Sequence, residues 1–240
     1  MKKDNEWYSY FSKINWSIKE IDINERPGLT IKNMIKKELN KDVLRIFKVM
    51  KRNPRVYRVE LDDGTVLRFE IMNLSEHNKI LLQNTANLYH DGTPKIIFYK
   101  IVGKRIFKFS EWIHGKLLAE VGHLKEVNIK EGEMFAKLNN IKDPKTGLFI
   151  TIGEINNTSM IWTEDRRLVI IDQGTIRALT GNKIDGVVYK NLIKRVKYKK
   201  RIDMFLEGYS KHRDISNILK IANKSNWTFG KKKLKKLEGV

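Results

Sequence analysis

The segment Ile152–Arg177, IGEINNTSMIWTEDRRLVIIDQGTIR, constrains this chain most, because strand and turn signals alternate in it at close spacing. The apolar runs Met160–Thr163 and Leu168–Ile171 predict two short strands, and the charged residues between them predict a tight turn. Such a hairpin would bring Glu154, in the loop before it, close to Asp172, which follows it. Two carboxylates at the mouth of a hairpin suit the binding of a metal ion and the orientation of a hydroxyl.

Composition places the chain among globular proteins and excludes several classes of site. Its 240 residues can bury a sizeable core, as one domain or as two small lobes, and 41% of them are hydrophobic. There is no cysteine, which excludes disulfides, a thiolate nucleophile and a cysteine-based zinc site. The five histidines lack metal-ligand spacing and lie far from Glu154 and Asp172 in sequence, which disfavours a histidine-based hydrolase.

The charge of the chain is strongly positive, +20, from 48 Lys and Arg against 28 Asp and Glu. An excess of this size attracts polyanions. It is concentrated in Lys190–Arg201, which has seven basic residues and no acid, and in the tail at Lys231–Lys236. These two segments are the candidate contacts for nucleic acid, lipopolysaccharide or anionic lipid, although a merely lysine-rich composition would give the same excess.

The sequence contains no membrane-spanning pattern. No apolar run approaches the roughly 20 residues that a transmembrane helix needs. The first residues, MKKDNEWYSYFSKINW, lack the apolar core of a signal peptide. We therefore expect a cytoplasmic protein, with peripheral attachment to a membrane left open.

The first half of the chain predicts an antiparallel sheet with two helices. The expected strands are 42–51, 56–61, 66–72, 95–102 and 105–113, and Asp63-Gly64 supplies a hairpin turn between the second and third of them. The expected helices are 31–40, capped by Thr30, and 75–90. In the second half, 127–141 and 202–209 read as helices.

In order and spacing, these features resemble the protein-kinase-like superfamily, and in particular its small atypical members. Those are the lipopolysaccharide-core and Kdo kinases, the Rio-type kinases and the Bud-type kinases of the tRNA-modification complex. The run GEINNTSMI is similar to their GDLxxxNxI, and Asp172-Gln173-Gly174 stands where kinases have Asp-Phe-Gly. The runs EWIHG, FAKLNN and FLEGY resemble the hinge, the helix before the catalytic loop and a later helix of these families.

The resemblance implies an α+β, bilobal protein-kinase-like fold, with a small antiparallel-sheet lobe and a larger, mainly helical lobe. The implied divisions are an N-terminal helical arm at 1–41, an N-lobe at 42–113, a C-lobe at 114–226 and a basic tail at 227–240.

The resemblance also implies that ATP binds with Mg²⁺ or Mn²⁺. Glu154 and Asp172 would be the catalytic residues, and Asp172 would hold the metal with help from Ser159 or Asn157. The residues assigned to the nucleotide are Arg52, Arg55, Arg68, Glu76, Glu111, Trp112 and Ile113. Backbone groups of the last three would read adenine, and Trp112 would flank the purine or fill the core.

The strand after Asp63-Gly64 has no lysine to pair with the phosphates. Arg68 and Glu70 share one face of it, so either takes the lysine position according to register. With Arg68 there, Glu76 either forms an ion pair with Arg68 or is simply an acid in the first helical turn, where the helix dipole favours it. The preceding turn, 51–55, has no glycine, so its arginines contact phosphate or it is an ordinary charged turn.

Two functions remain in view. One is an ATP- and magnesium-dependent phosphotransferase whose acceptor is a saccharide, a lipid headgroup or a protein hydroxyl. The other is a catalytically degenerate pseudokinase that binds a polyanion through its basic surface. The missing lysine, the missing glycines and the triplet Ile152-Gly153-Glu154 in place of His-Arg-Asp favour the second. Both carboxylates survive in kind, which favours retained nucleotide binding, so the sequence leaves enzymatic activity undecided.

Overall fold

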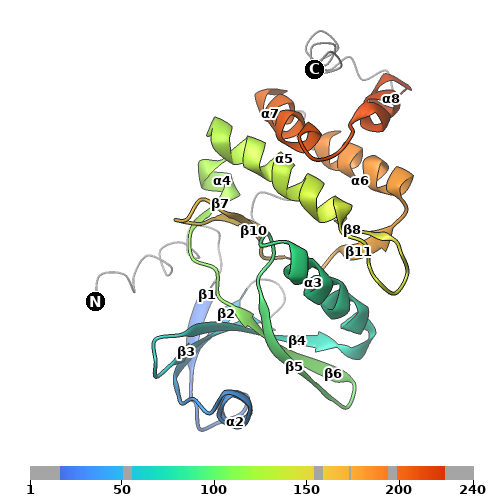
Figure 1. Cartoon of the computed structure of the whole chain (residues 1–240). Helices are drawn as coiled ribbons and strands as arrows, with labels where there is room; N and C mark the ends of the chain where they lie inside the picture. The colour runs from blue at the N-terminus through green and yellow to red at the C-terminus, as the bar shows by residue number, and fades with distance from the viewer. Residues whose placement is uncertain (1–16, 51–55, 154–158, 173, 194–198, 225–240) are drawn as a thin grey trace. The chain divides into compact units, whose positions relative to one another are not determined.

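A computed structural model of the chain describes residues 17–50, 56–153, 159–172, 174–193 and 199–224. The chain divides into two compact units. Unit 1 holds Met1–His77 and Pro94–His114, and unit 2 holds Asn78–Thr93 and Gly115–Val240. Unit 1 is built on an antiparallel sheet, whereas unit 2 is mainly helical (Figure 1). Across the described ranges, no helix has both the length and the apolar character that crossing a membrane requires.

Unit 1 contains a six-stranded antiparallel sheet in the order β1-β2-β3-β4-β6-β5. Its strands are β1 (Ser17–Ile21), β2 (Val43–Met50), β3 (Val56–Leu61), β4 (Val66–Asn73), β5 (Ile96–Val102) and β6 (Arg105–Glu111). The five predicted strands are confirmed to within two residues at each end. The edge strand β1, which pairs with β2, was not predicted.

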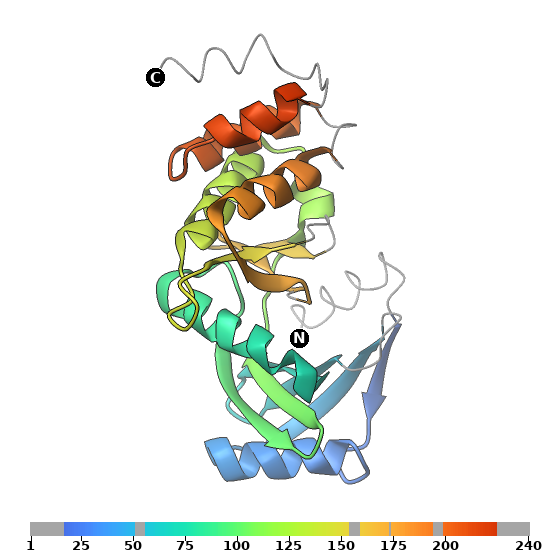
Figure 2. The ribbon, with the colours of Figure 1, turned by 90° about the vertical axis from the view of Figure 1, so that its right-hand side faces the viewer.

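One face of this sheet is apolar and packs against helix α2 (Gly28–Leu39). Figure 2 shows α2 lying across this side of the sheet, where fully buried Ile31 and Ile35 meet side chains such as Val59 and Phe109. This face supplies the hydrophobic core of unit 1.

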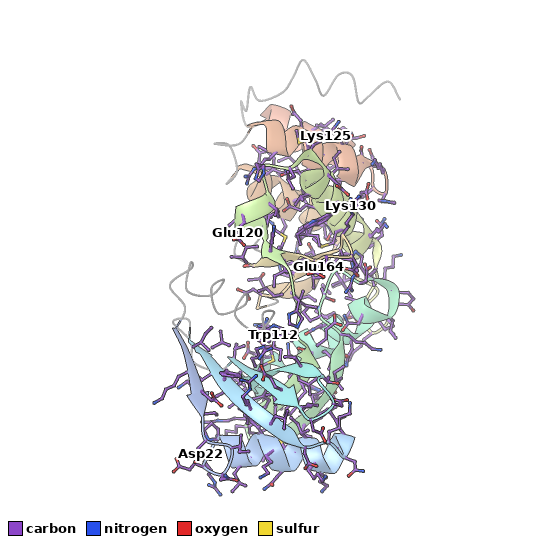
Figure 3. The ribbon with its side chains drawn as sticks, turned by 90° about the vertical axis from the view of Figure 1, so that its left-hand side faces the viewer. Asp22, Trp112, Glu120, Lys125, Lys130 and Glu164 are labelled. Atoms are coloured by element: carbon purple, nitrogen blue, oxygen red, sulfur yellow. The ribbon has the colours of Figure 1, made fainter. Side chains whose placement is uncertain are left out.

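Helix α2 begins earlier than the sequence predicted. Its N-cap is Pro27 and its first residue is Gly28, so the predicted cap, Thr30, lies in the first turn. A Cβ atom at Gly28 would overlap the carbonyl oxygen of Asp22, which lies just after β1 and is labelled in Figure 3. The helix therefore starts at the one residue type that can approach the preceding backbone this closely.

Unit 2 consists mostly of helices, with two small sheets, β10-β9-β7 and β11-β8. The helices are α3 (His77–Tyr89), preceded by a 3-10 turn η1 (Leu74–Glu76), α4 (Leu118–Val121), α5 (Lys125–Asn140), α6 (Gly181–Ile193), α7 (Lys199–Ser210) and α8 (Ser216–Lys224). The strands are β7 (Lys116–Leu117), β8 (Phe149–Ile152), β9 (Met160–Trp162), β10 (Leu168–Ile170) and β11 (Ile176–Leu179). The predicted helices 75–90, 127–141 and 202–209 correspond to α3, α5 and α7.

The centre of unit 2 is the contact between α5 and α7 (Figure 1). A Cβ atom at Gly132 would overlap the carbonyl oxygen of Phe205, and one at Gly208 would overlap that of Ile129. The two helix backbones therefore touch directly, because no side chain separates them at the crossing. Beside the crossing, fully buried Tyr209 accepts a hydrogen bond from Asn139 Nδ2 at 3.0 Å, and burial raises the pKa of the Tyr209 hydroxyl to about 12.

Hydrogen bonds and an ion pair of Arg213 link the helices around this core. Arg213 Nη1 donates hydrogen bonds to the carbonyl oxygen of Asn139 at 3.0 Å and to Asn140 Oδ1 at 3.1 Å. Its Nε lies 3.6 Å from Asp185 Oδ1, and Asn217 Nδ2 donates to Asp185 Oδ2 at 2.8 Å. Residues from α5, α6 and α8 are thus held by one guanidinium group and its carboxylate partner.

Candidate functional site

The predicted hairpin of unit 2 is present. Strands β9 and β10 pair antiparallel, with Met160 opposite Ile170, and Glu164 lies in the turn that joins them (Figure 3). The ladder continues one step beyond the strands, because the Ile171 N–H donates to the carbonyl oxygen of Ser159 at 2.8 Å. This bond sets Ser159 opposite Ile171, so that Asp172 follows directly at the open end of the hairpin.

Asp172 and Ser159 differ in their exposure. Asp172 is exposed, and its Oδ1 accepts a hydrogen bond from the Gly174 N–H at 3.2 Å. Ser159 is only 3% exposed. One solvent-facing carboxylate therefore stands next to a buried hydroxyl-bearing residue. Glu154 and Asn157, the other predicted residues of this site, lie outside the described residues.

This donor set fits a magnesium ion shared with a phosphate rather than one enclosed by protein. Among the residues that the structure describes, no three Asp, Glu, His or Cys side chains are grouped as metal ligands. Mg²⁺ usually binds proteins through one or two carboxylates and completes its shell with water and substrate phosphates. Asp172 meets that minimal requirement.

Arg177, which was not among the predicted site residues, lies beside the backbone of Gly153. Strands β8 and β11 pair with Thr151 opposite Arg177, and the Gly153 N–H donates to the Thr175 carbonyl oxygen at 3.1 Å. A Cβ atom at Gly153 would lie 2.9 Å from Arg177 Nη2. The guanidinium group therefore covers the backbone one residue before Glu154. No local pattern could have shown this, because the contact depends on the pairing of two strands far apart in sequence.

In unit 1, the sheet face opposite α2 carries charged side chains. The register sets Arg58 opposite Arg68, and Arg68 opposite Ser110. One step along, Glu70 stands opposite Lys108. We call this surface the polar face; its polar side chains are Glu20, Arg45, Arg58, Glu60, Arg68, Glu70, Lys108 and Ser110. Arg68 and Glu70 share it, as the sequence predicted.

Glu70 lies between two cations on the polar face. Its Oε1 is 2.7 Å from Arg68 Nη2, and its Oε2 is 2.6 Å from Lys108 Nζ. Burial alone would raise the pKa of the Glu70 carboxyl, but the charges of Arg68 and Lys108 outweigh it and lower that pKa to about 2. Glu70 is therefore ionised at neutral pH and holds both cations.

A second carboxylate of the polar face is bound in the same way. Glu60 Oε2 lies 2.7 Å from Arg45 Nε, and Glu60 Oε1 forms an ion pair with Arg58. The Arg58 guanidinium also lies 5.7 Å from the centre of the Trp112 ring and 5.8 Å from that of Phe47. Trp112, labelled in Figure 3, is therefore a cation–π partner of the polar face, whichever of the two predicted roles it has.

The predicted ion pair between Arg68 and Glu76 is replaced by other contacts. Arg68 binds Glu70, its neighbour on the same face of β4. The Glu76 carboxylate accepts the Asn73 N–H at 3.1 Å, which closes a capping box at η1. Glu70 is two residues from Arg68 on the same strand, so its carboxylate is beside Arg68 as soon as the strand forms. If Glu76 paired with Arg68 instead, the capping box at η1 would be lost.

The segment predicted to bind adenine, residues 111–113, uses part of its backbone for hydrogen bonds with other parts of unit 1. The Glu111 N–H donates to the Lys95 carbonyl oxygen at 2.9 Å, and the Trp112 N–H donates to that of Val66 at 3.3 Å. Of the three residues, Ile113 is therefore the first candidate for a backbone donor to a purine. Arg52 and Arg55, predicted at the phosphates, lie outside the described residues.

Neither a family model nor a curated protein matches the sequence. Solved structures do match. Spectinomycin phosphotransferase, in complex with ADP and spectinomycin, gives a TM-score of 0.60 at 8% identity, over 79% of this chain and 83% of that one. An aminoglycoside phosphotransferase from Alicyclobacillus acidocaldarius gives 0.48 at 9% identity, over 79% and 92%. The Cydia pomonella granulovirus kinase gives 0.45 at 14% identity, over 63% and 58%.

The spectinomycin phosphotransferase structures establish the fold. The same protein bound to AMP also gives a TM-score of 0.60, over 80% of this chain. The predicted α+β, bilobal protein-kinase-like fold is therefore confirmed. At 8% identity the likeness concerns the fold alone, and it does not distinguish among the atypical kinase families that the sequence resembles.

Proposed function

We propose that this chain is a nucleotide-dependent phosphotransferase, which moves a phosphoryl group from ATP to a hydroxyl acceptor. The observation that carries the proposal is the hydrogen bond from the Ile171 N–H to the Ser159 carbonyl oxygen. It sets exposed Asp172 next to the residue opposite buried Ser159. In the resemblance to kinases, Asp172 and Ser159 correspond to the residues that hold the metal ion. The fold shared with spectinomycin phosphotransferase, a protein solved with ADP and with AMP, supports it.

In this proposal the residues of unit 2 carry the chemistry. Asp172 holds Mg²⁺ or Mn²⁺ together with Ser159, and Asn157 assists. Glu154 orients the acceptor hydroxyl and receives its proton. The metal, when bound with the nucleotide, neutralises charge on the transferred phosphate.

The residues of unit 1 bind the nucleotide. Arg68 contacts the phosphates, as do Arg52 and Arg55, and backbone groups around Ile113 read adenine. Among the acceptors that the sequence leaves open, we place a small saccharide-like molecule first, because spectinomycin is the acceptor named for the matching structure. A lipid headgroup and a protein hydroxyl follow.

A thermal-shift titration with ATP, with and without Mg²⁺ or Mn²⁺, tests the first step. A ligand that binds only the folded protein raises its melting temperature with concentration, so a metal-dependent rise is expected. ADP formation should then be measured with a panel of saccharides, lipid headgroups and serine peptides. Absence of any shift at millimolar nucleotide would contradict the proposal.

Asp172→Asn is the variant that separates metal binding from overall folding. It should remove the metal-dependent part of the shift and abolish turnover. Asp165→Asn is the matched control, because Asp165 is a carboxylate in the turn of the same hairpin, 2.6 Å from Arg167 Nε. Equal turnover in wild type and Asp172→Asn would overturn the assignment of Asp172.

A second candidate, a polyanion-binding pseudokinase, is favoured by one observation: strand β4 presents Arg68 and Glu70 rather than a lysine. Its basic segments would bind nucleic acid or anionic lipid. Affinity should then fall steeply and linearly on a plot of log affinity against log salt. Affinity independent of salt would exclude it.

A further inference from the structure

We propose that Lys108, on strand β6, supplies the phosphate-binding ammonium group that strand β4 lacks. The role of Lys108 rests on the proposed binding of ATP. It also removes the strongest sequence argument against that binding, since the lysine is not missing from the sheet but stands on the neighbouring strand.

The strand register carries the proposal. In the resemblance to kinases, the phosphate-pairing lysine belongs on β4, at the position of Arg68 or Glu70. Lys108 lies directly opposite Glu70 in the β4–β6 pair. Residues opposite each other in an antiparallel pair have Cβ atoms about 5 Å apart. A lysine side chain has a flexible four-carbon stem, which spans a displacement of that size.

The cations of the polar face outnumber its carboxylates. It carries four cations, Arg45, Arg58, Arg68 and Lys108, against three carboxylates, Glu20, Glu60 and Glu70, a surplus of one positive charge. Buried charge is costly unless it is neutralised. A polyphosphate has the opposite charge and several acceptor oxygens, so it would offset the surplus.

Two donors on the polar face point to the same kind of ligand. Ser110 is 1% exposed, and its Oγ makes no hydrogen bond with any described residue. Arg68 Nε is likewise buried without a hydrogen-bond partner among the described residues. Ser110 and Arg68 are cross-strand neighbours, one step from Lys108. Two cations and a hydroxyl group thus gather in one area, where a phosphate could accept from all three.

Lys108 is the least exposed of these three neighbouring charged side chains. The side chains of Arg68 and Glu70 are 16% and 18% exposed, whereas that of Lys108 is 6% exposed. Lys108 therefore lies deeper, and Glu70 fixes its Nζ at 2.6 Å. An ammonium group has three N–H donors, so a lysine can bind a carboxylate and a phosphate oxygen at once.

The test compares the affinities of the Lys108→Met variant for MgATP and for adenosine, measured by calorimetry. If Lys108 acts on the phosphates, the variant should bind MgATP at least ten times more weakly, while its affinity for adenosine stays within twofold of wild type. If Lys108 has only a structural role, its replacement should lower the affinities for MgATP and adenosine equally. Lys108→Arg should recover part of the MgATP affinity, because the positive charge returns.

Lys100→Met is the matched control. Lys100 also forms a lysine–glutamate ion pair, with Glu38 at 2.5 Å, but it lies on β5 opposite Phe107, on the apolar side of the sheet. The Lys100→Met variant should bind MgATP and adenosine as wild type does. If Lys108→Met does not fold, the double variant Glu70→Gln, Lys108→Met removes both charges together and should show the same selective loss.

The outcomes separate the role of Lys108 from the proposed function. Equal MgATP affinity in wild type and Lys108→Met overturns the role of Lys108 but leaves the phosphotransferase standing. An equal loss of affinity for MgATP and for adenosine in Lys108→Met also overturns the role of Lys108. A wild-type protein that binds no MgATP overturns both.

Discussion

The two faces of the sheet in unit 1 are both buried, but by different means. On the α2 side, aliphatic and aromatic residues such as Ile46 and Phe69 meet the helix. On the polar face, Arg58 and Lys108 are almost fully buried, although they carry full charges. Apolar burial is the main source of folding free energy, whereas a buried ion pair is often no more stabilising than an apolar pair of similar volume. The comparison therefore indicates that α2 and its face contribute most of the stability of the sheet, while the polar face contributes less.

The largest effect should come from the apolar face. Phe109 is fully buried, and its ring centre lies 4.4 Å from that of Phe98 and 4.7 Å from that of Phe69. Phe109→Ala should lower the free energy of unfolding by about 4 kcal/mol, because it removes a large side chain and leaves a cavity. Denaturant unfolding measures this. Ile101→Ala, at a position 47% exposed, is the control and should change little. A loss below about 1 kcal/mol for Phe109→Ala would contradict the assignment of the stability of the sheet to this face.

A somewhat smaller effect should come from breaking the ion pairs of the polar face. Glu70→Gln leaves the charges of Arg68 and Lys108 without the carboxylate between them. Removing one partner of a buried pair costs about 3 kcal/mol, and this should be seen in the same denaturant experiment. Glu38→Gln removes the carboxylate from the Lys100 pair, which is about one-third exposed, and should cost far less.

The contribution of Glu70 should also depend on pH in one direction. Its pKa is 4.5 in the unfolded chain and about 2 in the folded protein. A lowered pKa means that the carboxylate stabilises the fold fully above about pH 4.5 and ceases to do so as the pH falls towards 2. The difference in unfolding free energy between wild type and Glu70→Gln should therefore shrink across this window. A difference that stays constant from pH 6 to pH 3 would contradict the ion-pair assignment.

The smallest effect on stability should come from making the polar face apolar. The triple variant Arg68→Met, Glu70→Met, Lys108→Met replaces the whole ion cluster with side chains of similar volume and leaves none of the three charges without its partner, so its unfolding free energy should stay within about 1 kcal/mol of wild type. Its affinity for MgATP should nevertheless fall at least as far as in Lys108→Met. A variant that keeps both stability and MgATP affinity would show that the ion pair serves neither.

Local patterns predicted the fold well, because each strand and helix is formed by one short continuous segment with a recognisable residue pattern. The alternation in 56–61 and 66–72, with Asp63-Gly64 between them, predicted β3 and β4 and also the shared face of Arg68 and Glu70. The hairpin of unit 2 was predictable for the same reason. Its two strands are separated only by a charged turn, so the proximity of Ser159 and Asp172 followed from neighbouring residues.

Contacts between distant segments could not be predicted in this way. Lys108 meets Glu70 because β4 and β6 are neighbours in the sheet, although α3 and β5 separate them in the chain. Arg177 meets Gly153 through the pairing of β8 with β11. The edge strand β1 lacked a turn signal, because α2 lies between it and its partner β2. In each case the sequence indicates which side a residue faces, but not which strand lies beside it.

The division of the chain has a consequence for its synthesis on the ribosome. Helix α3 belongs largely to unit 2 but is translated between β4 and β5 of unit 1. The backbone just after it is held by a 2.8 Å hydrogen bond from Ile170 to the Gly92 carbonyl oxygen. Ile170 is made about 80 residues later, which at 5–20 residues per second is a delay of roughly 4–16 s. The sheet of unit 1 is thus complete while α3 still awaits its partners, so the nascent chain presents this helix to chaperones before it can be buried.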